Sequence, residues 1–246
     1  MPFFKRLLIT TMLLILPFTA MAQDDAITEA RVRELVRETL LANPEILMEA
    51  IAILEDRAAQ DRVTGSAEMI AAQRQLLERD PNAPVLANAD GDVTIVEFFD
   101  YNCPYCRRVV PAVEGLIETD SGIRLVYREW PILGEGSVFA ARAALAARQQ
   151  GLYEEFHAAM MGMNGRAEER SVLIIAEEIG LDIDQLRADM EAPEVAEHIE
   201  TSMRLAELLG ITGTPTFILG NNLVPGAVEQ DVLQRLVEEV REGQVE

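Results

Sequence analysis

Apolar residues recur at helical spacing in the N-terminal part of the chain. From residue 27 to residue 59 they fall every three or four positions, and Asn43-Pro44 supplies an N-cap and a first helical residue between two predicted helices. A third helical pattern covers residues 66–79. The turn-forming cluster from Asp80 to Pro84 follows and predicts a domain boundary.

Beyond this boundary the apolar pattern becomes that of a mixed α/β domain. Residues 93–99 are rich in Thr, Ile, Val and Phe and predict a buried central strand. We expect a helix over residues 104–119 and a second strand over residues 123–129. A strand, a helix and a strand joined by short connections form a βαβ unit, in which the two strands lie parallel.

The C-terminal half is predicted to be a helical block followed by a hairpin and a helix. Residues 137–209 are helical in pattern, with breaks at Gly151, Gly162 to Gly165, Gly180 and Pro193. After them we expect a strand over 216–219, a turn at Asn221-Asn222, a return strand near Leu223 and Val224, and a helix over 229–241.

These elements predict three segments. We expect a helical extension over residues 23–80 and, over residues 81–246, an α/β domain of order βαβ…ββα with a helical domain inserted at about 137–209. Residues 1–22 form the remaining segment, which has a different character.

The first 22 residues have the composition of a signal peptide. Lys5 and Arg6 precede an apolar run over residues 7–18, and Ala20-Met21-Ala22 ends the segment with small residues at the positions that a signal peptidase reads. The run is shorter than the 20 or so apolar residues of a membrane span. We expect cleavage after Ala22 and export to the periplasm; the alternative is an uncleaved N-terminal anchor.

Composition narrows the range of functions. The formal charge of −21 argues against nucleic-acid binding, because phosphate contacts depend on Lys and Arg. Nearly half of the residues, 49%, are apolar, so that a substantial core can form without crosslinks. The chain nevertheless has two cysteines, and only two residues separate them. They are therefore expected to serve chemistry more than stability.

The cysteine pair lies where a predicted strand gives way to a helix. Cys103 at the helix N-terminus would face unpaired N–H groups and the positive end of the helix dipole, which favour a thiolate. Cys106, one turn later, could attack a mixed disulfide formed at Cys103. Pro104 is tolerated in the first turn. The alternatives are a zinc site, for which His157 and His198 lie far off in the sequence, and an inert disulfide.

Two further features fit redox exchange. Gly213-Thr214-Pro215-Thr216 places a proline before a strand; a cis bond there would expose the Thr214 backbone to an extended substrate, and a trans bond is the alternative. Glu97 is a carboxylate within an apolar strand, and burial would raise its pKa and allow it to take the proton of Cys106. The alternative for Glu97 is a solvated position at a sheet edge.

Other polar and sulfur-containing residues have two interpretations. His157 and Met161, with nearby Met160 and Met163, are compatible with a copper(I) site, although methionines more often fill a core. His198, on an acidic helix, is expected to be a solvated surface residue.

Several motifs of the sequence resemble those of a known protein family. The strings VEFFDYNCPYC over 96–106, GTPTF over 213–217 and VPGA over 224–227 together resemble the DsbA family of thioredoxin-like proteins, over roughly residues 84–242. The N-terminal string LLANPEIL over 40–47 is similar to the helical extension of the suppressor-of-copper-sensitivity C branch.

The resemblance implies a role for each site residue. It implies a thioredoxin fold in which Cys103 is the nucleophile, Cys106 resolves, Glu97 is the buried acid and cis-Pro215 faces the disulfide. Pro104, Tyr105 and Thr214 complete the predicted substrate-binding set. The dipeptide between the cysteines is Pro-Tyr where DsbA has Pro-His, which puts a very strongly oxidising potential in doubt.

The sequence therefore predicts an exported thiol–disulfide oxidoreductase that acts on cysteine-containing proteins. An isomerase or shuttle is favoured slightly over a primary dithiol oxidase, since threonine before the proline is similar to isomerases of the wider group. We expect no cofactor beyond a redox-active Cys103–Cys106 disulfide, no metal and no nucleic acid.

Partners and oligomeric state follow from the same prediction. A membrane redox partner would reset the cysteines. Residues 27–59 would form a homo-oligomer interface, although their apolar stripe is equally explained by packing on the domain. The alternative from another class is a holdase or copper-sequestering protein whose cysteines act as ligands.

Overall fold

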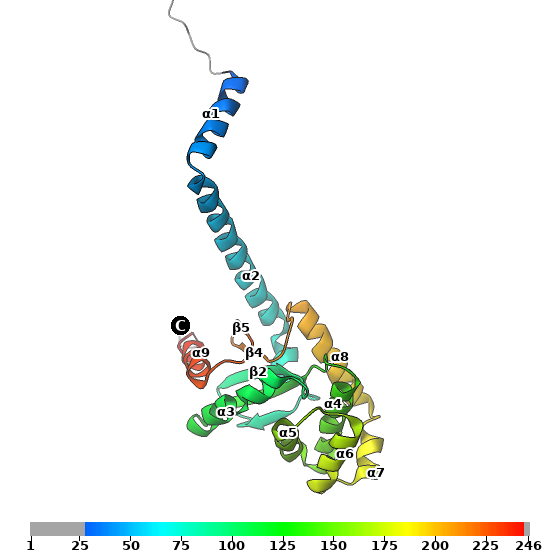
Figure 1. Cartoon of the computed structure of the whole chain (residues 1–246). Coiled ribbons are helices and arrows are strands. Elements are labelled where there is room, and N and C mark those ends of the chain that lie inside the picture. The colour runs from blue at the N-terminus through cyan, green and yellow to red at the C-terminus, as the bar shows by residue number, and fades with distance from the viewer. Residues whose placement is uncertain (1–27, 244–246) are drawn as a thin grey trace, which may run out of the picture. The chain divides into compact units, whose positions relative to one another are not determined.

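The computed structural model describes residues 28–243 (Figure 1). The predicted signal peptide, residues 1–22, lies outside this range. Within it, no helix is both long and apolar enough to cross a membrane. Contacts divide the chain into two compact units that meet between Asp56 and Arg57, inside one helix.

The N-terminal unit is built from helix α1 and the first part of helix α2. Helix α1 (Glu29–Ala42) begins at Thr28, whose hydroxyl accepts a hydrogen bond from the Arg31 N–H at 3.3 Å. No residue of α1 is buried. Large apolar side chains are exposed on α1 and on the first part of α2: Val32, Leu35, Val36, Leu41, Ile46, Leu47, Met48, Ile51, Ile53 and Leu54.

Helix α2 (Glu45–Arg79) is longer than the sequence pattern predicts. The expected break between residues 59 and 66 is wrong, because the helix continues through Gly65. A single glycine inside a helix costs only about 1 kcal/mol relative to alanine, which the rest of a long helix can absorb.

A five-stranded sheet forms the centre of the second unit, in the order β1-β3-β2-β4-β5. Strands β2 (Val93–Phe99) and β3 (Ile123–Glu129) are parallel, with Val96 opposite Val126, as the βαβ prediction requires. Strands β4 (Thr216–Leu219) and β5 (Asn222–Pro225) form the hairpin, and β4 pairs antiparallel with β2. The short β1 (Val85–Ala87) was not predicted, because three residues are too few to show an alternation.

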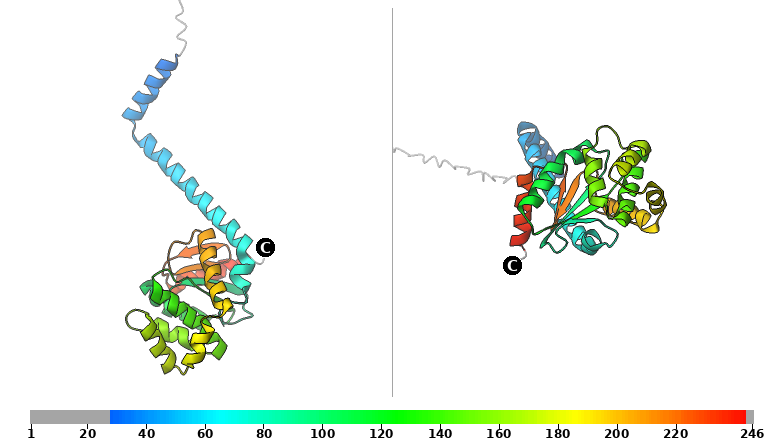
Figure 2. Two further views of the ribbon diagram at one scale, coloured as in Figure 1. Left: turned by 90° about the vertical axis from the view of Figure 1, so that its right-hand side faces the viewer. Right: turned by 90° about the horizontal axis from the view of Figure 1, so that it is seen from below.

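Helices cover both faces of the sheet. On one face α3 (Pro104–Thr119) and α9 (Gln230–Glu242) pack over Ile95 and Phe99. On the other face Ile70 and Leu77 of α2 and Leu205 of α8 (Pro193–Leu208) pack over the sheet. The inserted helices that precede α8 gather beside the sheet (Figure 2). They are α4 (Glu135–Ala147), the 3-10 turn η1 (Arg148–Gln150), α5 (Tyr153–Gly162), α6 (Glu169–Glu178) and α7 (Ile183–Asp189). The predicted α/β, thioredoxin-like architecture with a helical insertion is confirmed.

Buried charges connect the layers at the end of β3. Arg128, fully buried, pairs with Asp80 at 2.7 Å and donates to the carbonyl oxygen of Leu76 in the last turn of α2. It therefore satisfies a carbonyl that the helix end leaves without an intrahelical partner.

His198 is not the solvated surface residue that the sequence suggested. It is fully buried, and its Nε2 lies 2.7 Å from Oε2 of the buried Glu129. The hydroxyl of Tyr153 donates to the other oxygen of Glu129 at 2.6 Å. The acidic residues around His198 in the sequence gave no sign of this partner, which comes from a distant strand.

Candidate active site

The active-site loop leaves the end of β2 and is held by a buried carboxylate. Asp100 accepts hydrogen bonds from the N–H groups of Asn102 (2.7 Å), Ile132 (2.8 Å) and Leu133 (3.0 Å). Its carbonyl oxygen accepts the N–H of Cys103 at 2.9 Å. Because these bonds tie the loop after β2 to the loop after β3, the position of Cys103 is fixed from two sides.

Cys103 is the N-cap residue of α3, and Pro104 follows in the first turn. A hydrogen bond from the Cys106 thiol lowers the pKa of Cys103 to about 5, helped by the Thr214 side chain and the N–H groups of Cys106 and Tyr105; burial acts in the opposite direction. When protonated, the sulfur donates to the Thr214 carbonyl oxygen at 3.1 Å, which favours the thiol. The net effect favours the thiolate, with the hydrogen bond from the Cys106 thiol as the largest cause.

Cys106 lies one turn further along α3 and has no exposed surface. Burial raises the pKa of the Cys106 thiol far above its ordinary value, and the hydrogen bond to Cys103 and the charge of Glu97 act in the same direction. Both cysteines are reduced in this structure. The pair therefore combines one sulfur that ionises readily with one that holds its proton.

Glu97 is buried in β2, the central strand, with 3% of its surface exposed. The sheet-edge alternative is therefore wrong. Burial, together with the charge of Cys103, raises the pKa of Glu97 to about 8. The side chain lines a cavity of about 280 Å³ that α3, α5 and strands β1 and β3 also border. No hydrogen bond or ion pair joins it to another described residue.

The Thr214–Pro215 peptide bond is cis, which excludes the trans alternative. The loop is held by two hydrogen bonds, from the Thr216 hydroxyl to the Gly213 carbonyl oxygen (2.7 Å) and from the Gly226 N–H to the Pro215 carbonyl oxygen (2.8 Å). Thr214 is thereby held with its carbonyl oxygen against the sulfur of Cys103.

Two residues of this loop region escaped the sequence analysis. The Asn102 side chain bonds to the Ser137 hydroxyl and to both backbone groups of Ala167. Arg107 donates to the carbonyl oxygens of Tyr101, Met163 and Gly165. Both therefore fasten the active-site loop to the helical insertion. Only their position beside the cysteines could have drawn attention to them, since their partners lie far away in sequence.

An open groove begins beside Cys103. Its volume is about 570 Å³ and it runs between α3 and the loop that precedes α9. The residues that line it are Tyr105, Arg108, Val109, Pro111, Ala112, Thr214, Gly226, Ala227, Val228, Glu229 and Gln230. Two of the predicted substrate-binding residues, Tyr105 and Thr214, thus share one concave surface. Pro104 is exposed next to it.

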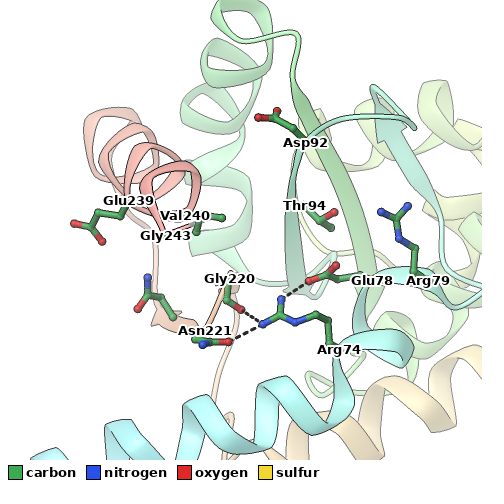
Figure 3. A pocket seen from close by; sticks show the side chains of 11 residues that line it. Arg74, Glu78, Arg79, Asp92, Thr94, Gly220, Asn221, Glu239, Val240 and Gly243 are labelled. Atoms are coloured by element: carbon green, nitrogen blue, oxygen red, sulfur yellow. Dashed lines mark hydrogen bonds and ion pairs between the residues drawn. The ribbon is translucent and has the colours of Figure 1, made fainter. Parts of the chain in front are cut away.

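A second pocket of similar volume lies elsewhere in the same unit (Figure 3). There Arg74 of α2 bonds to Glu78 (2.7 Å), to the Gly220 carbonyl oxygen (3.2 Å) and to the Asn221 side chain (2.6 Å). Figure 3 shows that these contacts join α2 to the turn between β4 and β5. Neither cysteine lines this pocket.

The histidines are not gathered around the cysteines. His157 lies among aromatic rings, stacked on Tyr127 with its Nδ1 3.1 Å from the Tyr101 hydroxyl, and burial lowers its pKa to about 4. Across residues 28–243 no three His, Cys, Asp or Glu side chains are grouped as a metal site would require.

Comparisons with known proteins agree with this geometry. Residues 94–238 match the DSBA-like thioredoxin domain, and residues 29–60 match the N-terminal domain of the copper resistance protein ScsC. A thioredoxin-like oxidoreductase from Silicibacter pomeroyi is 64% identical, over 69% of this chain and 98% of that one, with a TM-score of 0.68.

More distant structures cover more of the chain. ScsC of Proteus mirabilis in a transitional conformation is 29% identical over 87% of this chain and 97% of its own, with a TM-score of 0.65. The thiol-disulfide exchange protein alpha-DsbA2 of Wolbachia pipientis is 30% identical over 73% of this chain and 98% of its own, with a TM-score of 0.69.

Similarity to curated proteins is partial. The Na(+)/H(+) antiporter NhaA 1 of Salinispora arenicola is 32% identical over 150 residues, which are 60% of this chain and 23% of the antiporter. The chain thus spans about a quarter of the length of such relatives. Because the family match covers more than half of the chain, the protein belongs to the DSBA-like thioredoxin family.

Proposed function

We propose that the protein is a thiol–disulfide oxidoreductase that exchanges disulfides with cysteine-containing protein clients. The observation that carries this proposal is the pairing of a readily ionised sulfur, Cys103, which contacts the groove residue Thr214, with a fully buried thiol, Cys106, one turn further along α3. Thiolate character favours entry into exchange, and the groove next to Thr214 and Tyr105 gives a client segment a place to approach Cys103, which itself has 4% of its surface exposed.

The exchange proceeds in two displacements. The Cys103 thiolate attacks one sulfur of a client disulfide, that S–S bond breaks, and the other client sulfur leaves as a thiolate. Cys106 then loses its proton and attacks the Cys103 sulfur, which releases the second client thiolate and forms the Cys103–Cys106 disulfide. The client gains the two electrons that the cysteine pair loses; oxidation of a client dithiol follows the same steps in reverse.

Client binding follows from the groove beside Cys103. An extended segment can pair with the Thr214 backbone in the manner of an added strand, while its side chains rest against Tyr105. Pro104 and Pro215 hold the two loops that approach the mixed disulfide. The redox group is the cysteine pair itself, so that the reaction needs no other cofactor.

We assign to Glu97 the role of the base that takes the proton from the Cys106 thiol in the resolving step. Support comes from its burial, from the charge coupling between the two groups and from the cavity, which offers the proton a route toward solvent. With a pKa of about 8, both the protonated and the ionised form of this carboxyl are populated near neutral pH.

Glu97→Gln should slow resolution of the mixed disulfide by about 100-fold, the lower part of the usual range for acid–base catalysis. In the wild type the resolving rate should rise with pH through the pKa of Glu97 and then level off, and the variant should lose this pH dependence. Cys103 carries no charge in the mixed disulfide, so the midpoint is expected below the value of about 8 that holds beside the Cys103 thiolate. Single-turnover kinetics on a disulfide-bonded peptide measure both, with Cys103→Ser as the inactive control. An unchanged pH profile would remove Glu97 from the mechanism.

Isomerase or shuttle activity is proposed ahead of primary oxidation. The exposed apolar side chains of α1 and the first part of α2 support it, because such a surface on a soluble unit usually contacts a partner. We assign that partner to a second copy of the chain, which would present two active sites to one misfolded client.

The double substitution Leu35→Glu with Ile51→Glu should convert the oligomer to a monomer of about the chain mass, 27.3 kDa less any cleaved leader. Scrambled-substrate isomerase activity should be lost while dithiol oxidation is kept, as also expected for deletion of residues 23–60. Light scattering measures the mass, and the isomerase and dithiol-oxidation assays measure the two activities. The matched control, Thr39→Glu with Gln60→Glu, adds the same charge at exposed polar positions. A monomeric wild type would refute the assignment.

Export to the periplasm and resetting by a membrane redox partner complete the proposal. They rest on the sequence of residues 1–22 and on the similarity to a periplasmic thioredoxin-like protein of Salmonella enterica, 31% identical over 68% of this chain. Mass spectrometry of the protein from cell fractions tests export: a periplasmic chain that begins at Gln23 is expected, and a cytoplasmic chain with Met1 would contradict it.

A further inference from the structure

The groove beside Cys103 carries opposite charges on its two sides. Among the described residues that line it, Arg108 on the α3 side and Glu229 before α9 are the charged ones. Both side chains are exposed. The remaining lining is apolar, backbone or neutral polar, so these two residues set the local electrostatic field.

Arg108 keeps its hydrogen-bonding capacity for a ligand. Its guanidinium carbon lies 4.9 Å from the ring centroid of Tyr105, which is 51% exposed. No hydrogen bond or ion pair joins Arg108 to another described residue. Stacking on the ring holds the planar guanidinium in place, and its fork of N–H donors suits a carboxylate.

Arg108 lies in the second turn of α3, the helix that begins after Cys103. Side chains on a helix lean toward its N-terminus, and Tyr105 is two residues after Cys103. Arg107, which precedes Arg108 on α3, is also positively charged: it donates to loop carbonyls and is coupled electrostatically to Cys103. The first turns of α3 therefore carry positive charge near Cys103, and of the two arginines Arg108 lines the groove.

That local charge is opposite to the charge of the whole protein. The chain carries 42 acidic and 21 basic residues, so its field repels acidic segments at a distance. Glu229, on the other side, is the N-cap residue of α9, and its side chain makes no capping hydrogen bond. Its carboxylate is therefore available to a cationic group.

We propose that this groove selects client segments by charge. A preferred segment has an acidic side chain about two positions from the attacked cysteine, and this side chain pairs with Arg108. Basic side chains of the segment pair with Glu229. This specificity rests on the proposed function. An extended client segment rises about 3.3 Å per residue, so two of its residues span about 6.6 Å. This distance is similar to the rise of one turn of α3, about 5.4 Å. Opposite charges on the two sides also fix the direction in which the segment lies.

The test uses the reduced full chain and two cysteine peptides, each joined by a disulfide to a chromophoric thiol. The peptides are identical except for Glu or Lys two positions from the cysteine. Release of the chromophore reports attack by Cys103, and the same reaction with 2-mercaptoethanol corrects for the intrinsic reactivity of each peptide. The corrected Glu peptide should react about tenfold faster than the Lys peptide, a difference of about 1.4 kcal/mol.

Charge substitutions decide the assignment. Arg108→Glu should reverse the preference, and Glu229→Lys should strengthen it. Arg170→Glu is the matched control, because Arg170 is exposed, does not line the groove and gives the same change of net charge. The inference is overturned if Arg108→Glu keeps the preference for Glu, or if Arg170→Glu shifts it equally. If neither peptide reacts faster with the wild type than with 2-mercaptoethanol, the proposed function itself fails.

Discussion

Cys106→Ala should convert the protein into a covalent trap for its clients. Cys103 can still attack in this variant, because the groove, the helix N-terminus and the Thr214 contact remain; its pKa rises, since the hydrogen bond from the Cys106 thiol is lost. The second displacement has no nucleophile, so the mixed disulfide persists until a small thiol reduces it. Non-reducing electrophoresis and mass spectrometry of the variant mixed with oxidised client should show adducts that are near absent in the wild type.

Controls separate this outcome from other chemistry of the same sulfurs. Cys103→Ala should form no adduct, since Cys106 is fully buried and holds its proton. A protein that used its cysteines as copper ligands would instead show metal-dependent protection of both thiols from alkylation. Absence of adducts with Cys106→Ala in a glutathione buffer would contradict the exchange mechanism.

The equilibrium between the protein and glutathione should depend strongly on pH well below the pKa of an ordinary thiol. Reduction of the Cys103–Cys106 disulfide by two glutathione thiols yields glutathione disulfide, a protein thiolate and, above pH 5, one released proton. The equilibrium constant for forming the reduced protein should therefore rise about tenfold per pH unit. Between about pH 5.5 and pH 7.5 this amounts to about 100-fold, measurable by quantifying the two redox forms.

The same proton links redox state to stability. An unfolded cysteine has a pKa of about 8.5, whereas Cys103 in the folded protein has a pKa of about 5. Between these two pH values the unfolded chain binds more protons than the folded chain, so the free energy of unfolding of the reduced form rises with pH. This extra stability disappears as the pH falls through 5. The oxidised form has no such thiolate. A redox equilibrium that stays flat below pH 8 would contradict both consequences.

Local patterns were sufficient for the part of the fold that carries the cysteines. The strand over 93–99, the helix over 104–119 and the strand over 123–129 are observed with these bounds, because apolar periodicity and the proline after Cys103 are local signals. The burial of Glu97 follows from the apolar strand around it. The residues alone left both a cis and a trans bond before Pro215 as alternatives, and only the family resemblance favoured the cis bond.

What could not be predicted depends on contacts between distant segments. The pattern was divided between residues 59 and 66, whereas α2 is one helix through Gly65, whose C-terminal part packs on the sheet through Ile70 and Leu77. The pairing of His198 with Glu129, and the bonds from Asn102 and Arg107 to the insertion, join segments far apart in the chain. Sequence shows that such side chains can form ion pairs and hydrogen bonds, but only the fold selects their partners.

The most direct test of this account is the titration of Cys103 in the reduced full-length protein, followed by the ultraviolet absorbance of its thiolate and by the rate of alkylation at each pH. We expect a single ionisation with a pKa of about 5, while Cys106 stays protonated through the neutral range. A first ionisation near the value of a free cysteine, about 8.5, would contradict it.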